Sequence, residues 1–169
     1  MKISNQTVLI TGAAQGLGLA IANAFAKEKA KLILIDKKSN ELNKIKYDNC
    51  QKYVVDLNIR EETNGLINEL KKNSFVINTL IHNASILVPT PFIHTTEKIW
   101  DQTMKVTLES GFLLSKYVRE KGIKMVLSGE GADELFGGYG RLFKSPLDFY
   151  KKKMINPFYR PIDHFLERY

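Results

Sequence analysis

The stretch from Thr11 to Gly18, TGAAQGLG, decides the fold that this sequence predicts. It follows an apolar run over residues 7–10 and precedes a helical pattern over residues 17–29. A strand, a glycine-rich turn and a helix in this order form a site for a nucleotide diphosphate, because the N–H groups and the positive dipole end of the helix face the anion. The alternative is a tight strand–helix turn that holds no ligand.

Each glycine of this stretch has its own expected role. Gly12 permits the sharp turn, Gly16 lets the backbone approach a phosphate, and Gly18 lets the helix pack closely on the strand. A threonine before the first glycine and three residues between the first two resemble the short-chain dehydrogenase/reductase family. The resemblance implies an NAD(P)-binding oxidoreductase.

Length, charge and cysteine content narrow the class of protein. The chain has 169 residues, which suits one domain, and a net charge of +7 carried by scattered lysines. That pattern predicts no nucleic-acid-binding surface. A single cysteine, Cys50, excludes an internal disulfide. With neither a signal peptide nor a long apolar span in the sequence, we expect a cytoplasmic protein without membrane contact.

An acidic residue after the second predicted strand is a candidate for the adenosine end of a cofactor. Residues 32–35 are entirely apolar, as in a buried parallel strand, and Asp36 follows them. An acid here accepts hydrogen bonds from the ribose hydroxyls and repels a 2′-phosphate, which favours NAD over NADP. Lys37 and Lys38 are compatible with a phosphate, and a helix N-cap or turn role is the alternative for Asp36.

A third strand over residues 52–55 leads to Asp56, and a helix over residues 59–72 follows. The family resemblance implies that Asp56 receives the adenine amino group, and an N-cap role is compatible with this. The helical periods predict buried faces formed by Leu17, Ile21, Ala24 and Phe25 in the first helix, Leu66, Ile67 and Leu70 in the second, and Ile99, Trp100 and Met104 in a third that begins near Thr96.

The fourth predicted strand, residues 78–81, runs into His82-Asn83-Ala84-Ser85. This resembles the family's Asn-Asn-Ala-Gly, which lies beside the cofactor, with histidine and serine as departures. We interpret His82 as structural, because no carboxylate or nucleophile lies near it in the sequence. The resemblance implies cofactor contacts at Thr11, Gly12, Ala14, Gln15, Gly16, Leu17, Gly18, Asp36, Asp56, Leu57, Asn83 and Ala84.

The catalytic half of such a dehydrogenase is not found. The family needs a serine and a tyrosine–lysine pair four apart, both after the fifth strand. The pair Tyr117–Lys121 precedes the fifth predicted strand, residues 123–127, and we interpret it as ordinary helical spacing. Thr107 stands where the family has a catalytic asparagine. We therefore expect impaired oxidoreductase activity.

Residues 122–139, GIKMVLSGEGADELFGGY, resemble the synthetase domain of glutamine-hydrolysing asparagine synthetases. The resemblance makes Ser128, Glu130 and Asp133 candidate catalytic residues. It implies that Glu130 and Asp133 contact the reacting groups and the Mg–pyrophosphate of ATP, with Asp133 as a candidate metal ligand. A solvated loop and helix cap is the alternative, since the family's Ser-Gly-Gly-x-Asp-Ser loop and its glutaminase domain are absent from the sequence. An ATP-dependent asparagine synthetase fragment and a non-catalytic fusion product are therefore alternative functions.

These patterns together predict an α/β fold. We expect a Rossmann-type three-layer sandwich with a parallel sheet in the order 3-2-1-4-5 and an irregular C-terminal tail. Residues 1–128 form the expected dinucleotide-binding domain, and residues 129–169 form the synthetase-like segment. The join between dehydrogenase-like and synthetase-like sequence is expected at residues 114–118. A homo-oligomer is left open, and the sequence assigns no substrate.

Overall fold

The computed structural model of the chain describes residues 2–120 and 126–128, with the backbone alone at 92 and 126–128. These residues belong to the first of two units into which the chain divides, Met1–Gly129. The predicted C-terminal tail, including Glu130 and Asp133, lies outside the described residues.

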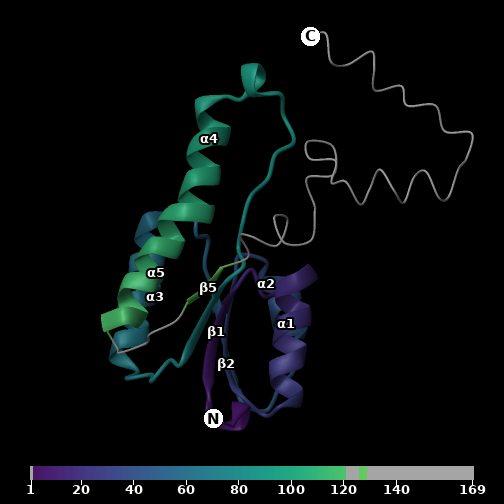
Figure 1. Cartoon of the computed structure of the whole chain (residues 1–169), viewed down its shortest axis with the longest axis vertical. Coiled ribbons are helices and arrows are strands. Elements are labelled where there is room, and N and C mark those ends of the chain that lie inside the picture. The colour runs from purple at the N-terminus through teal and green to yellow at the C-terminus, as the bar shows by residue number, and fades with distance from the viewer. Residues whose placement is uncertain (1, 121–125, 129–169) are drawn as a thin grey trace, which may run out of the picture. The chain divides into compact units, whose positions relative to one another are not determined.

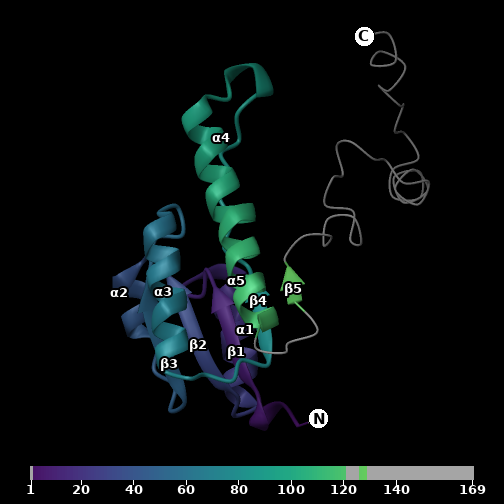
Figure 2. The same cartoon turned by 90° about the vertical axis from the view of Figure 1, so that its left-hand side faces the viewer.

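In the described part of the chain, five parallel strands form one sheet, and their order confirms the prediction. The strands are β1 (Thr7–Thr11), β2 (Lys31–Asp36), β3 (Cys50–Val54), β4 (Thr79–His82) and β5 (Val126–Ser128). The spatial order is β3-β2-β1-β4-β5 (Figure 2). Leu9 in β1 pairs with Ile33 of β2 on one side and Leu80 of β4 on the other. The order therefore reverses direction at β1, and the carboxyl ends of β1 and β4 lie side by side, the usual place for a ligand in such sheets.

Helices cover both faces of this sheet, which gives the predicted three layers (Figure 1). The helices are α1 (Gly16–Lys27), α2 (Ser39–Lys44), α3 (Arg60–Lys72), α4 (Glu97–Thr103) and α5 (Ser110–Glu120), with a π-helical segment η3 (Met104–Glu109) between the last two and short 3₁₀ turns η1 (Ile3–Asn5) and η2 (Phe92–His94). Helices α1 and α2 pack on one face, and α3 and α5 pack on the other. Among the described residues, no helix has the length and apolar character needed to cross a membrane.

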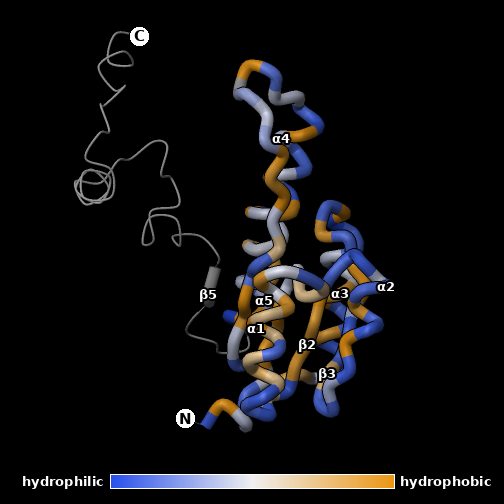
Figure 3. The backbone as a smooth tube through the Cα atoms, turned by 90° about the vertical axis from the view of Figure 1, so that its right-hand side faces the viewer, coloured by the Kyte–Doolittle hydropathy of each residue, from blue (hydrophilic) through white to orange (hydrophobic). Residues whose placement is uncertain are grey.

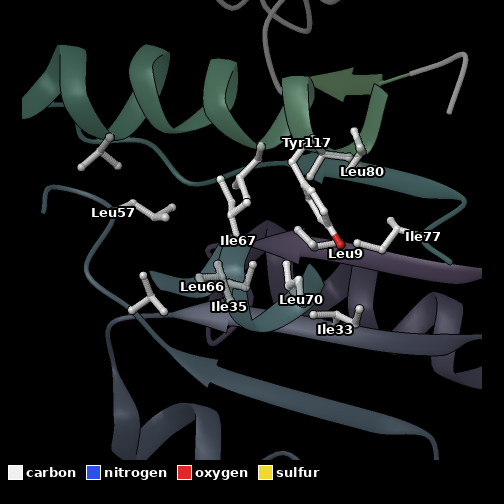
Figure 4. Close-up of a cluster of buried hydrophobic side chains, with 14 residues drawn as sticks. Leu9, Ile33, Ile35, Leu57, Leu66, Ile67, Leu70, Ile77, Leu80 and Tyr117 are labelled. Atoms are coloured by element: carbon white, nitrogen blue, oxygen red, sulfur yellow. The ribbon is translucent and has the colours of Figure 1, made fainter. Parts of the chain in front are cut away.

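The core lies on the two sides of the sheet. Ile33 and Ile35 of β2 face the cluster beneath α3 and α5, whereas Leu32 and Leu34 face α1 and α2. Because both faces are buried, the strand is an unbroken apolar run, visible as the hydrophobic tube of β2 in Figure 3. Figure 4 shows the first cluster, in which Tyr117 reaches from α5 towards the sheet.

Two of the predicted helix faces need correction. In α1, Leu17 is 64% exposed and Ala24 is also exposed, while Gly18 and Ala22 are buried. The close approach of α1 to the sheet requires small residues at the contact. The buried face of α1 is therefore the one that carries Gly18 and Ala22. In α4, the third of the predicted helices, Trp100 was expected to be buried but is 55% exposed. The predicted face of α3 is confirmed, since Leu66, Ile67 and Leu70 are all buried.

Candidate functional site

A pocket of about 310 Å³ opens at the carboxyl ends of the strands. Ligand pockets measure roughly 300–1,000 Å³, so its size suits a small molecule. Predicted contact residues that line it are Gly12, Gln15, Gly16, Leu17, Asp36, Asp56, Leu57, Asn83 and Ala84. Ser85, Ile86 and Val106 also line the pocket, although they were not among the predicted contacts. The position of Ser85 and Ile86 just after a strand was a usable signal, whereas Val106 comes from a distant helix and had none.

The glycine loop forms one wall of the pocket. Gly12 has φ of 64° and Gly16 has φ of 55°, a left-handed backbone that favours glycine. A Cβ atom on Gly18 would lie 2.1 Å from the carbonyl oxygen of Gly12, so only glycine lets α1 begin this close to the loop. The helix N-cap is Gln15, whose side chain makes no capping hydrogen bond. The first N–H groups of α1 therefore have no side-chain cap, as a site for an anion requires.

Asp36 holds the glycine loop as well as lining the pocket. Its Oδ2 accepts a hydrogen bond from the N–H of Ala14 at 2.9 Å, and its Oδ1 accepts one from the N–H of Lys38 at 2.9 Å. The turn role is therefore present, while the N-cap of α2 is Lys38 rather than Asp36. Each carboxylate oxygen can accept a further hydrogen bond from a ligand. Lys38 Nζ donates to Oε1 of Gln15 at 2.6 Å, which joins the N-cap of α2 to the glycine loop.

Asp56 lies after β3 in a turn that leads into α3. Its Oδ1 accepts from the N–H of Asn58 at 2.9 Å, and its own N–H donates to Oε2 of Glu62 at 2.7 Å. The N-cap of α3 is Ile59, so the predicted capping role of Asp56 is wrong. The physical reason is that the helix begins four residues later, at Arg60, and Glu62 in its first turn reaches back to the N–H of Asp56.

Thr11 connects the ends of β1 and β4 from behind the pocket. Its fully buried Oγ1 accepts hydrogen bonds from the N–H groups of Asn83 and Ala84 at 3.1 and 3.0 Å. Asn83 Nδ2 donates to the carbonyls of Thr11 and Gly12, each at 3.2 Å. Thr11, Ala14 and Gly18 thus support the loop without lining the pocket.

Among the described side chains, no candidate catalytic residue lines this pocket. Tyr117 is 2% exposed and lies in the core with Leu9 and Ile77 (Figure 4). Burial raises the pKa of Tyr117, which is the opposite of what a tyrosine proton donor and acceptor near neutral pH needs. Lys121 lies outside the described residues, and Ser128 is described by its backbone, which pairs with His82. Within residues 2–120 no group of His, Cys, Asp or Glu side chains could hold a metal.

Comparison with known proteins agrees with this geometry. The model of the short chain dehydrogenase family matches residues 6–131. An NAD-dependent glycerol dehydrogenase from Listeria innocua is 27% identical over 133 residues, covering 77% of this chain and 51% of that protein. A 3-oxoacyl-(acyl-carrier-protein) reductase from Buchnera aphidicola is 30% identical over 128 residues, covering 73% of this chain and 52% of that protein. The chain therefore spans about half the length of the curated relatives it matches.

A solved structure shows the same arrangement of strands and helices. It is a 4-hydroxyisoleucine dehydrogenase complexed with NADH, which is 25% identical, covers 73% of this chain and 55% of its own, and has a TM-score of 0.66. Sheet order, glycine loop and the family match over most of the chain lead to one conclusion: the chain belongs to the short-chain dehydrogenase family.

Proposed function

We propose that this chain binds a nicotinamide dinucleotide, NAD in preference to NADP, in the pocket at the carboxyl ends of the strands. The observation that carries this proposal is the meeting of the glycine loop, Asp36, Asp56 and Asn83 around one pocket. These residues come from four separate segments, and each supplies a type of contact that a different part of a dinucleotide needs.

The pyrophosphate binds at the start of α1. The first-turn N–H groups of this helix have no side-chain cap, and its first turn carries no acidic residue that would repel an anion. The left-handed backbone of Gly12 and Gly16 lets the loop turn around the phosphates.

The adenosine half binds at the ends of β2 and β3. Asp36 accepts the ribose hydroxyls with the lone pairs that its two backbone hydrogen bonds leave available, and Asp56 receives the adenine amino group. The carboxylate of Asp36 disfavours a 2′-phosphate, while Lys37 and Lys38, which also line the pocket, reduce that penalty. We therefore propose a preference for NAD rather than an exclusion of NADP.

The chain is an oxidoreductase by descent whose hydride-transfer chemistry we propose to be impaired. The relatives act on glycerol and on a 3-oxoacyl-(acyl-carrier protein), and a structural neighbour acts on 4-hydroxyisoleucine, so they indicate no common substrate. Thr107 stands in place of an asparagine, and the Tyr117 side chain lies in the core. We assign no catalytic residue among those that the structure describes.

The asparagine synthetase alternative is not proposed. The family match continues through the join expected at residues 114–118 and ends at residue 131. We propose that the dinucleotide-binding domain comprises residues 1–128, with residues 129–169 as a segment that is synthetase-like in sequence. Its candidates for Mg-ATP, Glu130 and Asp133, lie outside the described residues.

A thermal-shift titration of the full chain with NAD, NADP and Mg-ATP tests this proposal. A ligand at 100 times its dissociation constant stabilises the native state by about 2.7 kcal/mol, which raises the melting temperature measurably. We expect the largest shift with NAD. Absence of a shift with either dinucleotide contradicts the proposal, and a shift with Mg-ATP alone would favour the synthetase alternative.

The variant Asp36→Asn sharpens the cofactor assignment. Replacing the carboxylate is expected to weaken NAD about tenfold, the effect of one hydrogen bond to a charged group, and to narrow the preference over NADP. Each ligand-induced shift is compared with the variant's own melting temperature, because Asp36 also holds Ala14. Glu41→Gln, at an exposed acid of α2 outside the pocket lining, is the matched control.

A further inference from the structure

The imidazole of His82 lies between the glycine loop and the π-helical segment η3. His82 is the last residue of β4 and is 8% exposed. Its Nδ1 lies 3.1 Å from Oγ1 of Thr11, and its Nε2 lies 3.1 Å from the carbonyl oxygen of Thr107. One side chain therefore joins the end of β1 to a helix that follows β4.

The partners of His82 determine which ring nitrogen carries the proton. The Thr107 carbonyl can only accept, so Nε2–H donates to it. Thr11 Oγ1 already accepts two hydrogen bonds from backbone N–H groups, which occupy both of its lone pairs. Its hydroxyl proton is then donated to Nδ1. These two hydrogen bonds favour the Nε2–H tautomer and orient the ring between Thr11 and Thr107.

Helix α5 leaves space for this ring at a glycine. A Cβ atom on Gly111 would lie 2.8 Å from Cδ2 and 2.9 Å from Nε2 of His82, closer than side-chain carbons come to their neighbours. The backbone of α5 is therefore in direct contact with the imidazole. Any side chain at position 111 displaces the ring from the Thr107 carbonyl.

The segment that His82 holds forms part of the pocket wall. Val106, the neighbour of Thr107, lines the pocket, and so does Ile86, whose N–H donates to Oγ1 of Thr107 at 3.5 Å. This wall follows β4, whereas Asp36 follows β2, and β1 lies between these two strands. If Asp36 receives the adenosine ribose, the wall lies on the side of the nicotinamide half.

We propose that His82 is a positioning residue that fixes the wall formed by Ile86 and Val106, and so sets the affinity for the nicotinamide half of the dinucleotide. The proposal rests on the proposed function. His82 acts through the Thr107 carbonyl, since the ring does not line the pocket itself.

ADP-ribose lacks the nicotinamide. The affinity for NAD relative to the affinity for ADP-ribose therefore distinguishes a positioning role of His82 from a general effect on stability. We expect His82→Ala and Gly111→Ala each to weaken NAD about tenfold, the effect of about one lost hydrogen bond, while ADP-ribose changes less than about twofold. His82→Gln retains an N–H donor at similar reach and should recover most of the NAD affinity. Gly65→Ala, at a helical glycine with open space around it, is the control and should change neither ligand.

The double variant His82→Ala/Gly111→Ala provides an independent readout. Because Gly111→Ala acts by displacing the imidazole, we expect it to add no further loss once the ring is absent. Nitrogen-15 spectra of the imidazole rings should also show the Nε2–H tautomer for His82. If His82→Ala does not fold, Gly111→Ala and His82→Gln carry the same comparison.

The outcomes separate this inference from the proposed function. Equal weakening of NAD and ADP-ribose, additive effects of the two substitutions, or an Nδ1–H tautomer would each overturn the positioning role while dinucleotide binding stands. A wild-type chain that binds neither ligand refutes the proposed function and the positioning role together. Selective loss of NAD with rescue by glutamine supports both.

Discussion

The two walls of the pocket are built in different ways. The wall after β1 and β2 is shaped mainly by the backbone, through the left-handed Gly12 and Gly16 and the hydrogen bond from the N–H of Ala14 to Asp36. The wall after β4 depends on side chains that reach distant backbone, such as His82 at the Thr107 carbonyl. Short motifs can therefore identify the first wall, whereas the second depends on which segments fold against each other.

The largest expected effect concerns the first wall. Gly18→Ala places a Cβ atom 2.1 Å from the Gly12 carbonyl oxygen, and a backbone neighbour cannot move aside as a side-chain tip can. We expect a loss of unfolding free energy greater than the ~1–3 kcal/mol of ordinary overpacking. Urea unfolding measures it, and Gly65→Ala should instead stabilise the chain by about 0.5–1 kcal/mol. Equal effects of the two substitutions would show that α1 does not pack as described.

The second prediction tests whether α5 belongs to the same core. Leu114 on the inner face of α5 is fully buried, whereas Leu108 in the adjoining π-helical segment is 60% exposed. We expect Leu114→Ala to reduce the free energy of unfolding by about 3 kcal/mol through lost burial and a cavity. Leu108→Ala should stay within about 0.5 kcal/mol, as surface substitutions do. A large effect of Leu108→Ala in a denaturant titration would mean that a further surface covers this residue.

The third prediction concerns the junction between the two walls. Thr11→Val keeps the shape of the side chain but removes the acceptor for the N–H groups of Asn83 and Ala84. We expect a loss of about 2 kcal/mol, because buried donors left without partners cost about 1–3 kcal/mol. Thr11→Ser, which keeps the hydroxyl, serves as the control in the same unfolding experiment. A neutral Thr11→Val would indicate that the ends of β1 and β4 are joined by other contacts.

The smallest expected effect is at Tyr117. Its hydroxyl is buried without a hydrogen-bond partner among the described residues, so Tyr117→Phe should leave stability unchanged or raise it by up to about 1 kcal/mol. Dinucleotide binding should not change, since Tyr117 does not line the pocket. A strong loss of binding in a thermal-shift titration would restore Tyr117 as a functional residue.

The burial of Tyr117 also predicts how stability depends on pH in the alkaline range. Burial raises the pKa of Tyr117, so the folded chain keeps this proton at pH values where the unfolded chain releases it. Its contribution to stability is complete below pH ~10 and is lost as the pH rises beyond that value. Wild-type unfolding measured from pH 8 to 11 should therefore show a steeper decline than Tyr117→Phe. Parallel curves would contradict the burial of the hydroxyl.

Sequence patterns predicted the fold better than the contacts of the site. The sheet order was confirmed, because the family resemblance implies it, and the buried face of α3 was confirmed, because a strong helical period leaves few alternatives. The buried face of α1 was wrong at Leu17 and Ala24, because the side with most hydrophobic residues is not the side that fits closely on the sheet. The prediction that Trp100 is buried was wrong for a related reason, since an apolar residue on a helix need not face the sheet.

In the candidate site, the residues of the glycine loop and the acids after strands were accessible to sequence reasoning. Val106 could not be predicted in this way, because it reaches the pocket from the π-helical segment η3, which no sequence motif connects to the glycine loop. The structural interpretation of His82 came from its place at a strand end, but its partners Thr11 and Thr107 are 71 and 25 residues away in the sequence.

The sequence by itself determined the buried apolar strands, the glycine-rich turn at Thr11–Gly18, and the acid after the second strand. These features follow from local steric and hydrophobic preferences, which each segment carries wherever it lies. Tertiary structure alone decided that Asp36 holds Ala14, that His82 contacts the Thr107 carbonyl beside Gly111, and that Tyr117 lies in the core. The physical reason is that a hydrogen bond or a close contact between distant segments exists only after the hydrophobic core has brought their backbones together.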